Sequence, residues 1–238
     1  MGFEEVKERF QIFEKKHGKN AFLKVDEFLE EIKAEYLKQR TKEYMDQGII
    51  QNEAHNKARQ SWRPKVGSFL ESLVKYMIEE FCGDSDIKIS SDKKLKKREL
   101  SKELSLLRSM MEVHFNEYSL LPDADLVLYK YNEKLEKVKV LCILSLKTSF
   151  RERFTETPYW KLKLKQDPRT EKIKVFMVTP DNTDEISYSG SNGPRKARII
   201  MEYELDGIYM AREEFDESKK IKGLHDLFEN LEEIIKEK

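Results

Sequence analysis

The stretch LPDADLVLYKYNEKLEKVKVLCILSLKTSFRER, residues 121–153, decides the fold. Residues 126–129 and the almost continuously apolar residues 138–146 are typical of strands, the second of them covered on both faces. Turn-compatible polar residues separate the two, so we predict a β-hairpin. Because antiparallel neighbours lie about 4.8 Å apart, the aspartates before the first strand would meet the lysine after the second at one rim.

Asp123 and Lys147 are the two side chains at that rim with the clearest chemistry. A carboxylate binds a hard divalent cation such as Mg²⁺. The metal lowers the pKa of a bound water, and a neighbouring ammonium can orient that water for attack on phosphorus. The pair therefore favours phosphodiester hydrolysis. The alternative is a surface hairpin in which the two side chains only form an ion pair, an arrangement that is common in proteins.

The residues that follow Lys147 favour contacts with bases. Arg151, Glu152 and Arg153 follow the predicted catalytic lysine after three intervening residues. Arginine can donate two hydrogen bonds to O6 and N7 of guanine, and glutamate can accept one from N4 of cytosine. We therefore predict that this run reads G·C pairs in the major groove of DNA.

These residues together resemble the type II restriction endonucleases of the PD-(D/E)xK superfamily, in particular the branch that cuts at CCGG-type sites, BsaWI-like enzymes included. The resemblance rests on Pro122-Asp123, Ser145-Leu146-Lys147 and Arg151-Glu152-Arg153, and it covers roughly residues 63–165. It implies an α/β fold, with a mixed central sheet of about five strands flanked by helices and a helical N-terminal part.

The same resemblance implies the activity and the partners. The expected reaction is Mg²⁺-dependent hydrolysis of both strands of double-stranded DNA at a short, palindromic, G·C-containing site. A palindrome and cleavage of both strands imply a two-fold homodimer. A cognate DNA methyltransferase is implied only as a genetic partner. Two other functions are compatible with the residues, namely a repair or structure-specific nuclease of the same superfamily and a non-catalytic DNA-binding protein.

Ser145 departs from the general superfamily pattern, which has an acidic residue two positions before the lysine. A serine hydroxyl is a poor ligand for a hard divalent cation, so Ser145 would be a structural stand-in. In the branch that the chain resembles, a glutamate from a helix supplies the missing carboxylate. Glu71 and Glu156 are the candidates, and we favour Glu71, giving Asp123 and Glu71 as the metal ligands. Asp125 is a weaker candidate.

Composition and charge are compatible with one domain of 238 residues that has a helical part, residues 1–62, and an endonuclease core, residues 63–238. The 45 basic and 45 acidic side chains cancel. Their distribution is uneven, because residues 147–174 hold nine Lys or Arg against four Asp or Glu, whereas residues 202–238 hold six against twelve. A basic stripe beside the site fits phosphate contacts. Abundant Lys and Glu would equally suit heat adaptation.

Several classes of protein are disfavoured. No run approaches the roughly 18 consecutive apolar residues of a membrane span, and the start lacks the features of a signal peptide. Cys82 and Cys142 are expected to be free thiols in the cytoplasm, and their number excludes a cysteine metal site. The four histidines show no ligand spacing.

The remaining elements are predicted from periodicity and from breaking residues. Helices are expected at residues 3–16, 21–45, 51–61, 64–81, 92–111, 155–165 and 224–235, with a break at Trp62-Arg63-Pro64. Residues 83–91 are expected to form a loop. Strands are expected at residues 173–178, 197–203 and 206–210.

Two basic groups outside the hairpin are candidates for DNA contacts. The helix at residues 155–165 would present Lys161, Lys163 and Lys165 to the phosphates. The Gly/Ser-rich loop at residues 188–196 contains Arg195, and its glycines would let the backbone approach DNA closely. A plain exposed linker is an equally good interpretation of that loop.

Overall fold

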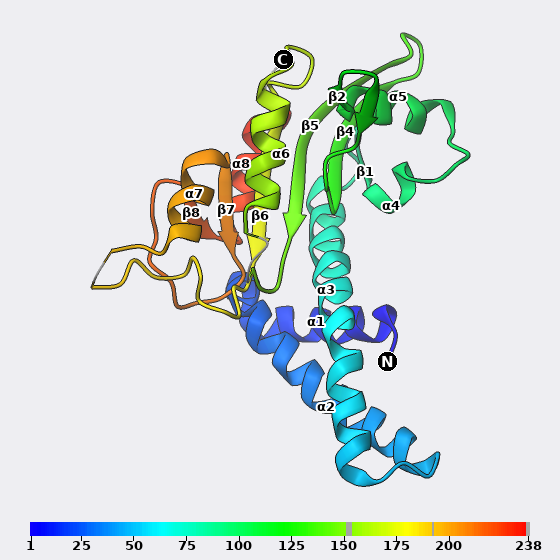
Figure 1. Ribbon diagram of the computed structural model, residues 1–238, viewed down its shortest axis with the longest axis vertical. Helices are drawn as coiled ribbons and strands as arrows, with labels where there is room; N and C mark the ends of the chain where they lie inside the picture. The colour runs from blue at the N-terminus through cyan, green and yellow to red at the C-terminus, as the bar shows by residue number, and fades with distance from the viewer. Residues whose placement is uncertain (151–153, 192, 237–238) are drawn as a thin grey trace.

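A six-stranded mixed sheet forms the centre of the molecule in the computed structural model, which describes residues 1–150, 154–191 and 193–236 (Figure 1). The strand order is β1-β4-β5-β6-β7-β8. β1, β4 and β5 are antiparallel, whereas β5 to β8 are parallel. The strands are β1 (Ile87–Ser90), β4 (Leu126–Asn132), β5 (Lys137–Leu146), β6 (Lys174–Thr179), β7 (Gly207–Met210) and β8 (Ile221–Gly223). The mixed sheet flanked by helices is thus confirmed, with one more strand than expected.

The predicted β-hairpin is present as β4 and β5, with Leu126 opposite Leu144 and Asn132 opposite Lys137. The second half of β5 is apolar except for Ser145, because both faces of the strand are covered. Leu144 belongs to the apolar core on one side of the sheet and Ile143 to the core on the other. Such double coverage explains why this strand reads as a continuous hydrophobic run.

Two layers of helices cover the sheet. On one face lie α1 (Phe3–His17), the 3₁₀ helix η1 (Gly18–Lys24), α2 (Val25–Asp46), α3 (Gln51–Cys82) and α8 (Asp226–Lys236). On the other lie α5 (Lys102–Met111), α6 (Glu156–Lys165) and α7 (Lys196–Glu204). The short helix α4 (Asp92–Leu95) precedes α5, and a separate hairpin is formed by β2 (Val113–Phe115) and β3 (Tyr118–Leu120).

α3 is one continuous helix of 32 residues that contains Pro64, so the predicted break at residues 62–64 is wrong. A proline inside a helix costs about 3 kcal/mol, because it removes a hydrogen bond and crowds the preceding turn. Packing offsets this cost. The Trp62 ring lies 5.3 Å from that of Tyr36 and 6.0 Å from that of Phe69, centroid to centroid. The expected boundary at residues 62 and 63 falls inside this helix.

The second half of α2 and the first half of α3 extend beyond the sheet as an antiparallel pair of helices, which we call the helical arm (residues 33–63; Figure 1). At 1.5 Å per residue, α3 is about 48 Å long, longer than the sheet it crosses. Ala54, Ala58 and Trp62 are buried at four-residue intervals along its arm portion. This spacing gives α3 one apolar stripe that packs against α2.

Three further expectations are corrected. Residues 83–91 contain β1, and residues 92–111 form two helices, α4 and α5, rather than one. Residues 197–203 lie in helix α7 and not in a strand, since Ala197, Arg198 and Met201 are buried at helical spacing while Ile199 is exposed. In the part of the chain that the structure describes, no helix has the length and apolar character needed to cross a membrane.

Candidate active site

The hairpin brings Lys147 close to both aspartates at its rim. Lys147 Nζ lies 3.7 Å from Asp123 Oδ2 and 3.5 Å from Asp125 Oδ2. The two aspartates differ in their anchoring. The backbone N–H of Leu146 donates to Asp125 Oδ2 at 2.7 Å, whereas Asp123 is the more exposed of the two, 44% against 25%. Asp125 is therefore fixed to the end of β5, and Asp123 is more open to a ligand.

Burial raises the pKa of Asp125 above its ordinary value. The ammonium of Lys147 and the N–H of Leu146 oppose that rise, while the negative charges of Asp123 and Glu71 add to it. Glu71 therefore lies near enough to act on Asp125, although it comes from α3 and not from the hairpin. Three carboxylates thus share one end of the sheet.

Lysines from α4 and its C-terminal end surround these carboxylates. Lys93 Nζ donates to Glu71 Oε2 at 2.7 Å, and Lys96 Nζ donates to Asp92 Oδ2 at 2.7 Å. The hydrogen bond to Glu71 raises the pKa of Lys93, and the one to Asp92 raises the pKa of Lys96. The sequence does not predict that these lysines face the carboxylates, because that depends on how α4 folds back toward α3.

Ser145 and Glu156 lie on the α6 side of the rim. Ser145 is buried, and its Oγ accepts a hydrogen bond of 2.9 Å from Thr157 Oγ1. This bond ties the end of β5 to the first turn of α6. Glu156 begins α6 and lines a cleft together with Lys147. Glu156 therefore shares a cleft with Lys147, whereas Glu71 acts on Asp125 from α3.

The cleft has a volume of about 790 Å³ and separates the helical arm from the rim that carries Lys147. Lys33, Arg59 and Arg63 of the arm line it, together with Glu30, which precedes the arm in α2. The rim contributes residues 147–150 and Glu156, and the loop after β6 contributes Asn182 and Thr183.

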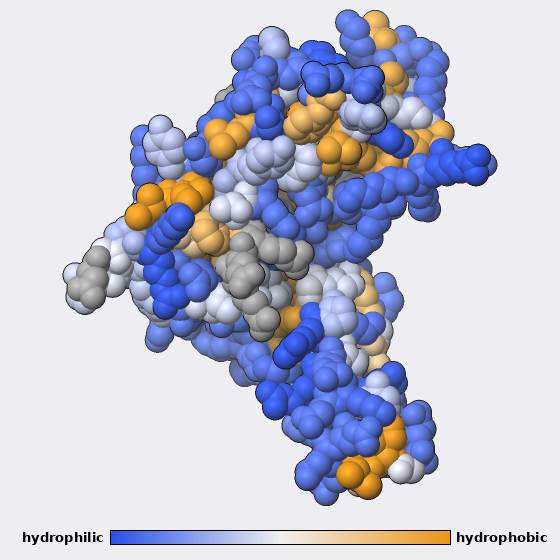
Figure 2. All heavy atoms as spheres, in the orientation of Figure 1, coloured by the Kyte–Doolittle hydropathy of each residue, from blue (hydrophilic) through white to orange (hydrophobic). Residues whose placement is uncertain are grey.

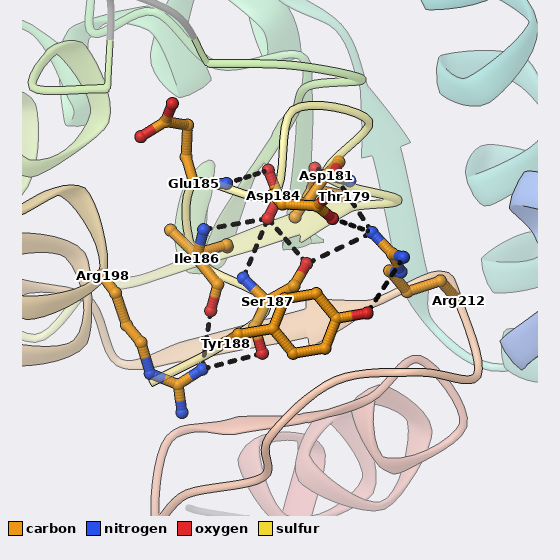
Figure 3. A network of polar contacts seen from close by, with 9 residues as sticks. All are labelled: Thr179, Asp181, Asp184, Glu185, Ile186, Ser187, Tyr188, Arg198 and Arg212. Atoms are coloured by element: carbon orange, nitrogen blue, oxygen red, sulfur yellow. Dashed lines mark hydrogen bonds and ion pairs between the residues drawn. The ribbon is translucent and has the colours of Figure 1, made fainter. Parts of the chain in front are cut away.

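The loop after β6 is held by a network around a buried aspartate (Figure 3). Asp181 is fully buried and accepts hydrogen bonds from the backbone N–H groups of Glu185, Ile186 and Ser187 at 2.9–3.1 Å. Ser187 Oγ adds a fourth at 2.7 Å. The backbone of Asp181 has φ +48°, a conformation that aspartate tolerates better than most residues. The loop is thereby folded back on its own carboxylate.

Two arginines close this network from outside the loop (Figure 3). Arg212, after β7, donates from Nη1 to Asp184 Oδ1 at 2.7 Å. The buried Arg198 of α7 donates from Nη1 to the carbonyl of Ile186 at 2.6 Å. The N–H of Asn182 also donates to the carbonyl of Thr148 at 3.0 Å, which joins this loop to the chain just after Lys147. None of these contacts was predicted, since an aspartate after a strand looks like an ordinary turn residue.

The remaining predicted contacts fall in different places. Arg151, Glu152 and Arg153 lie outside the described residues. Arg195 is exposed and pairs with Glu185 Oε1 at 2.9 Å. Lys161 is not presented to solvent for a DNA phosphate, contrary to the expectation. It is buried, and its Nζ lies 2.6 Å from Asp206 Oδ2 and donates to the carbonyl of Ile173 at 2.8 Å.

The donor set at the rim consists of carboxylate oxygens, which are the ligands that Mg²⁺ prefers. Asp123, Asp125 and Glu71 each have a lysine ammonium within 4 Å in this structure. No group of three or more Asp, Glu, His or Cys side chains is already arranged around a metal position within residues 1–150, 154–191 and 193–236. The chemistry of these residues fits a hard divalent cation, whose binding would require the lysines to give way.

Comparison with known proteins agrees with this fold. Residues 84–231 match the family described as BsaWI restriction endonuclease type 2. The chain is 43% identical over 213 residues to the putative type II restriction enzyme MjaVIP of Methanocaldococcus jannaschii. This match covers 89% of this chain and 93% of the relative. It is also 43% identical over 184 residues to the probable type II restriction enzyme HpyAORF263P of Helicobacter pylori, spanning 77% of this chain and 92% of that one.

Among solved structures, the fold is similar to that of the restriction endonuclease PspGI in a complex with substrate DNA. The TM-score is 0.58 at 14% identity, and the match covers 92% of this chain and 81% of the other. At such identity the likeness concerns the fold alone. Together with the family match and the two relatives, it confirms the resemblance seen in the sequence. The chain therefore belongs to the BsaWI family of type II restriction endonucleases, which are site-specific deoxyribonucleases.

Proposed function

We propose that this enzyme cleaves both strands of double-stranded DNA at a short, palindromic, CCGG-like site in a Mg²⁺-dependent reaction. The observation that carries the proposal is the placement of Lys147 Nζ within 3.7 Å of Asp123 and 3.5 Å of Asp125 at one rim of the sheet. A lysine beside carboxylates is the arrangement that metal-assisted phosphodiester hydrolysis needs. It is built here from two strand ends that the hairpin holds together.

Each rim residue has a distinct role in this proposal. Asp123, the more open aspartate, is the principal metal ligand, and Glu71 or Glu156 completes the ligand set. Bound Mg²⁺ would supply a Lewis acid and a water of lowered pKa. Lys147 orients the attacking water toward the phosphorus. Asp125 fixes the rim through its bond to the N–H of Leu146.

Specificity and assembly extend the proposal. Arg151, Glu152 and Arg153 read C·G pairs, and Arg195 contacts DNA from the loop before α7. A palindromic site implies a homodimer, in which each subunit cuts one strand. Residues 1–62 serve as a helical part beside the core of residues 63–238. The two free thiols, Cys82 and Cys142, suit the reducing cytoplasm, where a cognate methyltransferase would protect the host DNA.

The test is digestion of lambda-sized duplex DNA by the purified protein, with Mg²⁺ or with EDTA, followed by sequencing of the fragment ends. We expect discrete bands that share a G·C-containing palindrome, and no cleavage in EDTA or by the Lys147→Ala variant. A smear would instead indicate a nonspecific or structure-specific nuclease. Intact DNA under every condition, or undiminished cutting by Lys147→Ala, would overturn the proposed chemistry.

A further inference from the structure

The first half of α3 carries a polar stripe that faces the cleft. Asn56, Arg59, Gln60 and Arg63 all line it, and their spacing of three and four residues places them on one face of the helix. The opposite face holds Ala54 and Ala58, which are buried, whereas the largely buried Trp62 also lines the cleft. This stripe is therefore presented to the same space as Lys147, which lines the cleft from the catalytic rim.

In the described part of the chain, the two arginines of this stripe have no acidic partner, unlike several other cations of the helical arm. Lys33 pairs with Glu30 at 2.7 Å, Lys57 with Glu53 at 3.1 Å, and Arg40 with Glu43 at 2.5 Å. Arg59 and Arg63 are exposed and form no hydrogen bond or ion pair with any residue that the structure describes. Among the described residues, none uses the donors of these two guanidinium groups, which line the cleft.

The facing wall is rigid and also has an unused polar group. Thr183 Oγ1 is buried and has no hydrogen-bond partner within the described part of the chain. Its loop is fixed by the four hydrogen bonds to Asp181 (Figure 3). A buried hydroxyl without a partner is unfavourable, so a small shift of this side chain toward an oxygen-rich ligand in the cleft would be favoured.

The size of the cleft limits what it can hold. A volume of about 790 Å³ suits a ligand of a few linked groups and is far too small for a whole duplex. A short length of one sugar-phosphate backbone fits both the size of the cleft and the charge of its lining, which has four Lys or Arg against two Glu. Four residues of helix place Arg59 and Arg63 about 6 Å apart along the axis, so they are able to reach different phosphates of one strand.

We infer that the helical arm is a second wall of the DNA-binding groove, in which Arg59 and Arg63 hold the backbone of the strand that Lys147 attacks. The inference rests on the proposed action on duplex DNA and adds to it the path of the bound strand. The arm surface agrees with this use, because it is mostly hydrophilic in Figure 2. Its exposed large apolar residues, Met45 and Ile50, flank the turn at its far end, away from Arg63.

Phosphate contacts have a specific signature. Each cation that neutralises a phosphate releases counterions, so the logarithm of the binding constant falls with the logarithm of salt concentration by about 0.9 per contact. We expect Arg59→Ala and Arg63→Ala each to reduce this slope by roughly one, and the double variant by roughly two, on any duplex. Affinity would fall several-fold, and the sequence at the cut ends would be unchanged.

The measurement is fluorescence anisotropy of a labelled duplex in EDTA across a salt series, together with thermal unfolding of each variant. Lys57→Ala is the matched control. It removes a cation from the same stretch of α3, but Lys57 does not line the cleft. Arg63→Lys keeps the charge and should keep most of the slope. Unchanged slopes for both arginine variants, or a loss equal to that of Lys57→Ala, would overturn the inference.

Failure of the inference is distinguishable from failure of the proposed function. Suppose that the wild-type protein cuts DNA at a defined site and that the arginine variants bind DNA with the same salt dependence as the wild type. Then only the assignment of the helical arm as a wall of the groove is wrong. If the wild-type protein neither binds nor cuts duplex DNA, the proposed function itself is wrong. An altered cleavage sequence in the Arg63→Ala variant would also overturn the inference, since it would make Arg63 a base contact.

Discussion

Lys93 Nζ lies 2.7 Å from Glu71 Oε2, so an ammonium already occupies the carboxylate that α3 offers to the site. A divalent cation that uses Glu71 has to displace this lysine. Lys93 is 70% exposed, and an exposed ion pair contributes only about 0.2–1 kcal/mol. The competition is therefore modest, and it is open to measurement.

We expect Lys93→Met to lower the Mg²⁺ concentration at half-maximal cleavage by roughly two- to fivefold, the factor that a pair of this strength represents. Titration calorimetry with Mn²⁺ on the DNA-free protein should show a matching gain in metal affinity. Lys94→Met, which removes an exposed charge from the same short helix, serves as the control. Equal metal affinity in wild type and Lys93→Met would show that Glu71 is not a ligand or that the lysine does not compete.

Glu71→Gln and Glu156→Gln separate the two candidates for the second ligand. We expect Glu71→Gln to reduce cleavage by at least a hundredfold and to weaken Mn²⁺ binding, because Glu71 is near enough to act on Asp125. Glu156→Gln should retain metal binding. The readouts are single-turnover cleavage and calorimetry. The reverse pattern would assign the ligand to the start of α6.

Asp125→Asn should stabilise the metal-free protein at neutral pH while impairing cleavage. Burial raises the pKa of Asp125 in the folded state, so its ionisation opposes folding. Stability is therefore full below the ordinary value of 3.8 and falls as pH rises through the raised value. We expect a higher Tm for the variant than for the wild type at pH 7 in EDTA, by about 2–4 °C for each kcal/mol gained in the free energy of unfolding. Near pH 3 the two proteins should have equal Tm values. A lower Tm at pH 7 would mean that the bond to Leu146 and the pairing with Lys147 outweigh burial.

Lys161→Ala should destabilise the protein by about 3 kcal/mol, because it breaks a buried pair and leaves Asp206 without its nearest cation. Desolvation lowers the pKa of Lys161, and the contact with Asp206 counteracts that shift. Urea unfolding gives the free energy. Lys165→Ala, an exposed change on the same helix, should cost less than about 1 kcal/mol. Similar losses for both variants would argue against a structural role for the buried pair.

Asp181→Ala should loosen the loop after β6. The change removes an acceptor of four hydrogen bonds, and bonds to a charged group contribute about 1.5–3 kcal/mol each. We expect a loss above roughly 3 kcal/mol and faster hydrogen exchange at the amides of Ile186 and Ser187. Asp181→Asn, which keeps one acceptor and tolerates positive φ, should lose less. Unchanged exchange in Asp181→Ala would show that the loop is held by Arg198 and Arg212 instead.

The sequence was sufficient for the hairpin and for the meeting of Asp123 with Lys147, because both follow from one contiguous stretch with strong local patterns. It was insufficient where distant contacts decide. Pro64 looked like a helix end, but Trp62 packs between Tyr36 and Phe69 and keeps α3 continuous. The sequence predicted that Lys161 contacts a phosphate, and only the fold shows that it pairs with Asp206.

The same limit applies to residues 197–203 and to the loop after β6. A short segment with Ile199-Ile200 suits a strand or a helix equally well, and its neighbours in the fold select the helix. Asp181 carries no local signal, since its partners are backbone N–H groups that only a folded loop presents. Contacts through the backbone leave no trace in residue type.

The unbroken course of α3 has a consequence for how this family can vary in length. Arg63 and Glu71 are borne by one helix, in which each residue adds 1.5 Å and about 100° of rotation. Inserting or deleting a single residue between them would turn the arm away from the rim while leaving both side chains intact. Functional homologues should therefore hold this interval at constant length and accept length changes in the turn at residues 47–50, which lies outside both helices.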